Sequence, residues 1–146
     1  MIEFDRAKWR LASLWFALGG LILTIVFLQA LFGKFGQRTD EVWNWMLPTI
    51  MPSLTLIAGV IVADAQHTQA QRNVRKRYYY FALAISAFYL ALVLSIILLE
   101  PLVSAMTGSN LFDLIGRTGI ILGPLQGMAT TALGIFFIKK TDDNDE

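Results

Sequence analysis

Four long runs without a charged residue dominate the pattern of hydrophobic and polar positions along this chain. Each run is 21 to 23 residues long and apolar on all sides, and the 12 Lys and Arg and 11 Asp and Glu residues lie between and around the runs. A helix on the surface of a soluble domain carries its apolar residues on one stripe. About 20 apolar residues in succession instead match the roughly 30 Å hydrocarbon core of a bilayer. The runs that predict membrane-spanning helices are 11–33, 42–63, 78–99 and 118–138.

The pattern predicts an all-α fold: an integral membrane protein whose single domain, residues 1–140, is a four-helix transmembrane bundle. Asn110 and Asp113 have the spacing of a capping box, so a short interfacial helix is expected at 111–117. The acidic residues at 141–146 predict a disordered tail. With their flanking residues, the four helices are expected at about 9–32, 43–66, 78–100 and 118–139.

The charged residues orient the predicted bundle. Nine of the 12 Lys and Arg residues lie in the three stretches that four crossings put on one side of the membrane: 1–10, 64–77 and 139–146. Cytoplasmic loops carry an excess of basic residues, so both termini are predicted to be cytoplasmic. Short loops and the lack of a glycosylation sequon favour a bacterial inner membrane. The lipid bilayer is thus the first expected partner, and a net charge of +1 gives no support for nucleic-acid binding.

A cytoplasmic basic patch precedes the third run. Contact with lipid headgroups and the setting of membrane topology account for such a patch. The alternative is that it docks an acidic cytosolic protein or a nucleotide. The patch consists of Arg72, Arg75, Lys76 and Arg77.

Small residues recur at every fourth position of the fourth predicted helix, in a series that resembles a glycine zipper. This spacing lets helix backbones approach closely, which is how helices pack in lipid. The favoured interpretation is packing within the chain against Ala87, Ala91 and Ser95 of the third helix. The alternative is self-association into a homo-oligomer, including one around a pore. The series is Gly119, Gly123, Gly127 and Thr131.

Two polar features near the middle of predicted spans form a candidate pore or polar core. Pro52 lies a full turn inside the second helix, where its missing N–H leaves a carbonyl without its helical donor. Gln126 is near the centre of the fourth helix, and a lone amide in lipid needs a hydrogen-bonding partner. That partner is either a carbonyl freed near Pro52 or water in a pore. A structural contact between helices is the favoured interpretation.

Two acids at the ends of the runs are candidates for ion pairs. Asp64 directly follows the second run on the cytoplasmic side and is expected to pair with Arg10 or Arg72. Glu100 and Arg117 are expected to pair in the same way on the outer side. A charge at the edge of lipid is stabilised by an opposite charge, so these pairs are interpreted as structural.

The candidate chemistry of the chain is defined mostly by residues that the sequence lacks. It has no Cys, a single His at position 67 and no acid or base near the middle of any run. Metal and haem sites need several such ligands, and proton-coupled transport needs a titratable group within the membrane. We therefore expect no catalytic residue, no metal or cofactor site and no enzymatic activity.

Three functions remain compatible with the sequence. The leading hypothesis is a small oligomeric channel or pore-type protein that alters membrane permeability. Homo-oligomerisation is expected because one chain of 146 residues has little interior in which to enclose a pathway. The first alternative is an accessory or scaffold subunit that docks cytosolic proteins, and the second is a small dimeric transporter.

Overall fold

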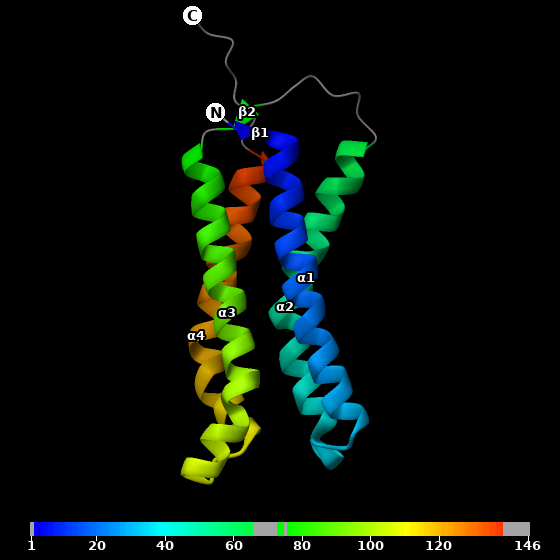
Figure 1. Ribbon diagram of the computed structural model, residues 1–146, viewed down its shortest axis with the longest axis vertical. Coiled ribbons are helices and arrows are strands. Elements are labelled where there is room, and N and C mark those ends of the chain that lie inside the picture. The colour runs from blue at the N-terminus through cyan, green and yellow to red at the C-terminus, as the bar shows by residue number, and fades with distance from the viewer. Residues whose placement is uncertain (1, 66–72, 75, 139–146) are drawn as a thin grey trace, which may run out of the picture.

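A computed structural model confirms the prediction of four helices that are long and apolar enough to cross a membrane. The structure describes residues 2–65, 73–74 and 76–138. The predicted acidic tail at 141–146 lies outside these ranges. The elements in chain order are β1 (Ile2–Glu3), α1 (Phe4–Leu31), the 3-10 helix η1 (Gly36–Arg38), α2 (Thr39–Ala65), β2 (Asn73–Val74), α3 (Lys76–Thr107) and α4 (Leu111–Ile138), as Figure 1 shows.

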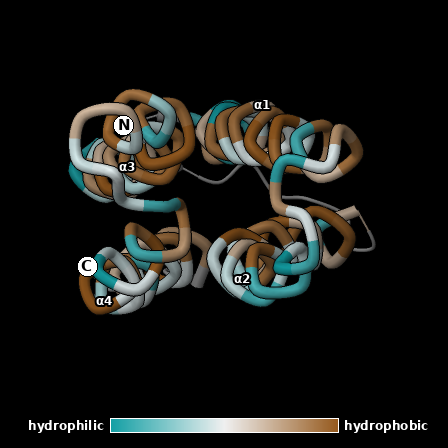
Figure 2. Tube along the Cα trace, turned by 90° about the horizontal axis from the view of Figure 1, so that it is seen from below, coloured by the Kyte–Doolittle hydropathy of each residue, from teal (hydrophilic) through white to brown (hydrophobic). Residues whose placement is uncertain are grey.

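The four helices stand at the corners of a square (Figure 2). α1 packs beside α2 and α3, and α4 packs beside the same two helices on the other side of the bundle. At the N-terminal end of the bundle α1 begins, α2 ends, α3 begins and α4 ends; the opposite end holds the connections at 32–38 and 108–110. The α1–α2 and α3–α4 ribbons diverge toward this opposite end (Figure 1).

All four helices begin before the predicted start, and α3 also ends later than predicted, because backbone hydrogen bonding continues through the charged residues there. α1 begins five residues before the predicted start, and α3 continues past Glu100 and Pro101 to Thr107. The separate short helix predicted at 111–117 is instead the start of α4. Its capping contact is present, because the Asn110 N–H donates to Asp113 Oδ2 at 3.2 Å. No residue after this cap ends the helix, so α4 runs on through Gly116.

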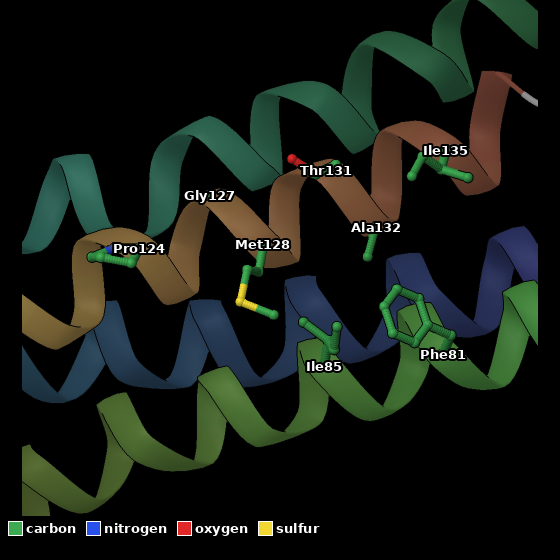
Figure 3. A pocket seen from close by; sticks show the side chains of 8 residues that line it. All are labelled: Phe81, Ile85, Pro124, Gly127, Met128, Thr131, Ala132 and Ile135. Atoms are coloured by element: carbon green, nitrogen blue, oxygen red, sulfur yellow. The ribbon is translucent and has the colours of Figure 1, made fainter.

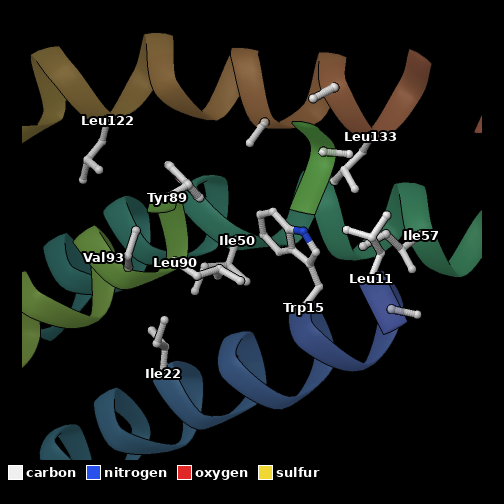
Figure 4. Close-up of a cluster of buried hydrophobic side chains, with 14 of the residues drawn as sticks. Leu11, Trp15, Ile22, Ile50, Ile57, Tyr89, Leu90, Val93, Leu122 and Leu133 are labelled. Carbon is white, nitrogen blue, oxygen red and sulfur yellow. The ribbon is translucent and has the colours of Figure 1, made fainter. Parts of the chain in front are cut away.

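Large apolar side chains from all four helices fill the interior of the bundle (Figure 4). Trp15, Ile50, Tyr89 and Leu133, one from each helix, are at most 1% exposed. The rings of Trp15 and Tyr89 lie 6.0 Å apart, centroid to centroid, across α1 and α3. Side chains therefore fill the core of the described bundle along its axis.

The N-terminal end of the bundle carries contacts that the hydropathy pattern did not predict. β1 and β2 pair antiparallel, with Ile2 opposite Val74, and so join the chain before α1 to the chain before α3. The ring of Phe4 stacks on that of Phe136 at 5.6 Å and links α1 to α4. These contacts join α1 to α4, and the chain before α1 to the chain before α3, at this end of the bundle.

Candidate functional site

The polar centre of the bundle forms around the prolines of α2. Pro52 has no N–H to donate to the carbonyl of Pro48, which lies four residues earlier and would accept that bond in a regular helix. Nε2 of Gln126, from α4, donates to this Pro48 carbonyl oxygen. The structure thus brings together the two candidate residues of the polar core, Gln126 and Pro52, through the carbonyl that the proline leaves free. Neighbouring helices commonly satisfy such freed groups in membrane proteins.

Two more polar contacts lie within two turns of this carbonyl along α2, and the sequence pattern did not predict either. The hydroxyl of Tyr89, from α3, donates to the Thr49 carbonyl at 2.8 Å. The hydroxyls of Ser53 and Thr130 lie 3.3 Å apart between α2 and α4. Several hydroxyl side chains near the middle of the uncharged runs could have indicated polar contacts between helices. Their partners could not be predicted, because they depend on how the helices are arranged. Together these contacts attach α2 to both α3 and α4 at mid-height.

Two polar atoms in the core are buried without a hydrogen-bonding partner among the described residues. They are Nε1 of Trp15 and Oγ of Ser86. A buried donor or acceptor that lacks a partner costs roughly 1–3 kcal/mol. The centre of the bundle therefore combines satisfied contacts around α2 with two unsatisfied groups between α1 and α3.

Asp64 pairs with a lysine rather than with the predicted Arg10. Nζ of Lys8 lies 2.8 Å from Asp64 Oδ2 and 3.2 Å from Asp5 Oδ1. The packing of α1 on its neighbours puts Lys8 on the buried face of the helix at 4% exposure, whereas Arg10 is exposed. Arg72, the other predicted partner, lies outside the described residues.

Glu100 likewise pairs with a lysine, and the predicted pair with Arg117 is wrong. Nζ of Lys34 lies 2.6 Å from Glu100 Oε2. Lys34 follows α1, which packs against α3, so the connection places its side chain beside Glu100, while Arg117 is exposed on α4. The guanidinium of Arg38 lies 3.7 Å from the ring centroid of Phe112. These two contacts link the diverging helix pairs at the end opposite the termini.

The glycines of α4 do not pack against α3, so the favoured interpretation of the glycine series is wrong. A Cβ placed on any α4 glycine would have no atom of a neighbouring element within 4 Å among the described residues. Gly19 of α1 shows the contrast, since a Cβ there would lie 3.3 Å from Cγ2 of Ile50. Spacings of three, four and seven put these glycines on one side of α4. They are Gly116, Gly119, Gly123, Gly127 and Gly134.

None of the three residues of the groove expected on α3 is buried, and Ala87 is partly exposed. Ala91 and Ser95 are exposed, and α3 instead buries Tyr89 and Val93. The last member of the series, Thr131, is also exposed.

A groove of about 460 Å³ runs along the outside of the bundle between α3 and α4. Figure 3 shows side chains of both helices around it, with Met128 directed from α4 toward Ile85 of α3. The lining is apolar apart from one hydroxyl. It consists of Phe81, Ile85, Pro124, Gly127, Met128, Thr131, Ala132 and Ile135.

The basic patch is described only in part. Lys76 and Arg77, the first residues of α3, are exposed at the N-terminal end of the bundle. Arg72 and Arg75 lie outside the described residues. Arg77, Phe81 and Ile85 are spaced by four and share one side of α3, so the groove begins one turn after an exposed guanidinium.

The described residues contain no group of three or more His, Cys, Asp or Glu side chains placed to hold a metal ion. Three features of the described residues are candidates for function: the polar centre around Pro48, the side of α4 that carries its five glycines (the glycine face) and the groove beside it. No protein-family model matches the chain, and neither a curated protein nor a solved structure is significantly similar to it.

Proposed function

We propose that this protein is a homo-oligomer of the bacterial inner membrane that alters membrane permeability, with both termini in the cytoplasm. Copies associate through the glycine face of α4, and the passage lies between copies. The protein acts without catalytic residues or a cofactor.

The observation that carries this proposal is the open glycine face. Helices in lipid associate by close backbone approach at small residues, yet a Cβ on Gly119, Gly123 or Gly127 would meet nothing of the rest of the described chain within 4 Å. The surface that suits close approach is therefore unused within one copy. A second α4 supplies the same spacing and fits it.

The filled core of the single chain favours a passage between copies. Trp15, Ile50, Tyr89 and Leu133 occupy the axis of the bundle, and the Gln126 amide nitrogen is engaged by the Pro48 carbonyl. Because side chains fill the described core of one copy, the boundary between copies is the favoured place for a passage.

The test is the substitution Gly123→Leu, with Gly20→Leu on α1 as its matched control. Both glycines are open, since a Cβ at either position meets nothing within 4 Å. The expected result is that Gly123→Leu becomes monomeric by light scattering in detergent and no longer releases a small dye from liposomes. The control variant should keep the oligomer and the dye release of the unmodified protein.

An unchanged oligomer in Gly123→Leu would exclude α4 as the interface. If liposomes with a high density of the intact oligomer release no dye, the proposed passage between copies is excluded and the scaffold alternative is favoured. In that case a stoichiometric protein partner should be recovered on gentle solubilisation of the native membrane.

A further inference from the structure

We infer that the groove between α3 and α4 is a binding site for an anionic phospholipid of the cytoplasmic leaflet, with an acyl chain in the groove and the phosphate at Arg77. The inference rests on the proposed membrane location and orientation. It does not depend on a pore or on an oligomer.

The lining of the groove suits a hydrocarbon chain. Phe81 and Ile85 from α3 face Met128 and Ala132 from α4 across the space between the helices (Figure 3). The volume of about 460 Å³ falls within the roughly 300–1,000 Å³ of small-molecule sites. Methionine adapts its shape to irregular apolar partners. Gly127 carries no side chain that would narrow this space.

The length of the groove matches one leaflet. Its lining on α4 runs from Pro124 to Ile135, which are 11 positions apart, so it extends about 16 Å along the helix. Half of the hydrocarbon core of a bilayer is about 15 Å. The groove therefore starts near the N-terminal end of the bundle and stops at mid-height, as an acyl chain of a single leaflet does.

The charge at the mouth of the groove selects the headgroup. Arg77 is exposed one turn before Phe81 on the same side of α3. A guanidinium binds phosphate oxygens with two parallel hydrogen bonds. The cytoplasmic leaflet contains anionic lipids. A lipid whose acyl chain lies in this groove would place its negatively charged headgroup beside Arg77. Lys76 is also exposed, but it is the preceding residue and points to another side of α3.

The test is native mass spectrometry of the full chain in detergent with added phosphatidylglycerol or phosphatidylcholine of identical acyl chains. The expected result is that phosphatidylglycerol is retained in preference. Arg77→Gln should weaken its retention about tenfold, because it removes the charge-assisted hydrogen bonds from the guanidinium to the phosphate. The matched control is Lys76→Gln, which removes the same charge one residue away and should leave retention within twofold.

A second pair of variants tests the acyl chain. Met128→Trp fills the groove and should reduce retention of both lipids. Ile121→Trp, seven residues earlier on the same side of α4 and outside the groove, should not. Three results would each overturn the inference. The first is equal retention of the two lipids, and the second is an equal loss of phosphatidylglycerol retention in Arg77→Gln and Lys76→Gln. The third is unchanged lipid retention in Met128→Trp.

The same spectra separate this inference from the proposed function. They report the number of chains as well as the number of lipids, so a monomeric Gly123→Leu that still retains phosphatidylglycerol supports the lipid site by itself. If Met128→Trp dissociates the oligomer and leaves lipid retention unchanged, the groove holds a second copy of the chain and the lipid site is excluded.

Discussion

The hydrogen bond between Gln126 and the Pro48 carbonyl predicts an energetic coupling between Gln126 and Pro52. With Pro52 present, Gln126→Leu removes the donor that replaces the missing N–H, so the carbonyl is left unpaired. An interhelical hydrogen bond in a membrane protein is worth about 0.6–1.7 kcal/mol. We therefore expect Gln126→Leu to lower the free energy of unfolding by about 1 kcal/mol, roughly fivefold in the equilibrium constant.

The same substitution should cost close to nothing in a Pro52→Ala background. Alanine at position 52 restores an N–H that can donate to the Pro48 carbonyl along α2, so the side chain of Gln126 becomes redundant. A double-mutant cycle isolates the energy of the hydrogen bond between Gln126 and the Pro48 carbonyl. Any other effect of leucine at position 126 on stability is present in both backgrounds and cancels. The expected coupling energy is about 1 kcal/mol.

Reversible unfolding in mixed micelles of a mild detergent and dodecyl sulfate measures these free energies. The fluorescence of the buried Trp15 can report the transition. Thr118→Val is the control on the same helix, because the Thr118 hydroxyl donates to the Leu114 carbonyl within α4. Removing this hydroxyl should therefore have the same effect on stability with Pro52 and with Ala at position 52. An equal cost of Gln126→Leu in both backgrounds would refute the assignment of the freed carbonyl as its partner.

Two further predictions use the same unfolding assay. Ser86→Ala should raise the free energy of unfolding by about 1 kcal/mol, because it removes a buried hydroxyl that has no partner among the described residues. Ser53→Ala should lower it by about 0.6 kcal/mol, because its hydroxyl is hydrogen-bonded to Thr130 of α4. A loss of stability in Ser86→Ala would show that the Ser86 hydroxyl is hydrogen-bonded. Lys8→Met should destabilise by about 1.5 kcal/mol, since it removes the charge-assisted contact of Lys8 Nζ with Asp64 Oδ2 at 2.8 Å. Arg10→Met should stay within about 0.5 kcal/mol, and equal effects of the two variants would contradict the ion pair.

The sequence was a good guide to features that depend on neighbouring residues. The four apolar runs predicted four helices. The spacing of Asn110 and Asp113 predicted a helix start at residue 111, although the sequence assigned it to a separate short helix and not to α4. It was a poorer guide to helix ends. Charged residues mark where a helix leaves an apolar environment and not where its backbone hydrogen bonds stop, so α1 begins at Phe4 and α3 continues beyond Glu100.

The partners of the charged residues could not be read from the sequence. Lys8 and Arg10 are two positions apart on α1, and either can reach the end of α2 if the orientation of α1 is unknown. A rotation of 200° between two such residues puts them on opposite sides of the helix. Only the packing of α1 on its neighbours decides that Lys8 is buried beside Asp64 while Arg10 is exposed.

The sequence by itself determined the number of helices, their apolar character and the positions where polar atoms are left without local partners, as at Pro52. These are properties of single segments, because hydropathy and the helical hydrogen-bonding pattern depend on residues within a few positions. The tertiary structure decided which side of each helix is covered. It directed Gln126 to the Pro48 carbonyl and left the α4 glycines open, because the choice between faces depends on the shapes of all four helices together.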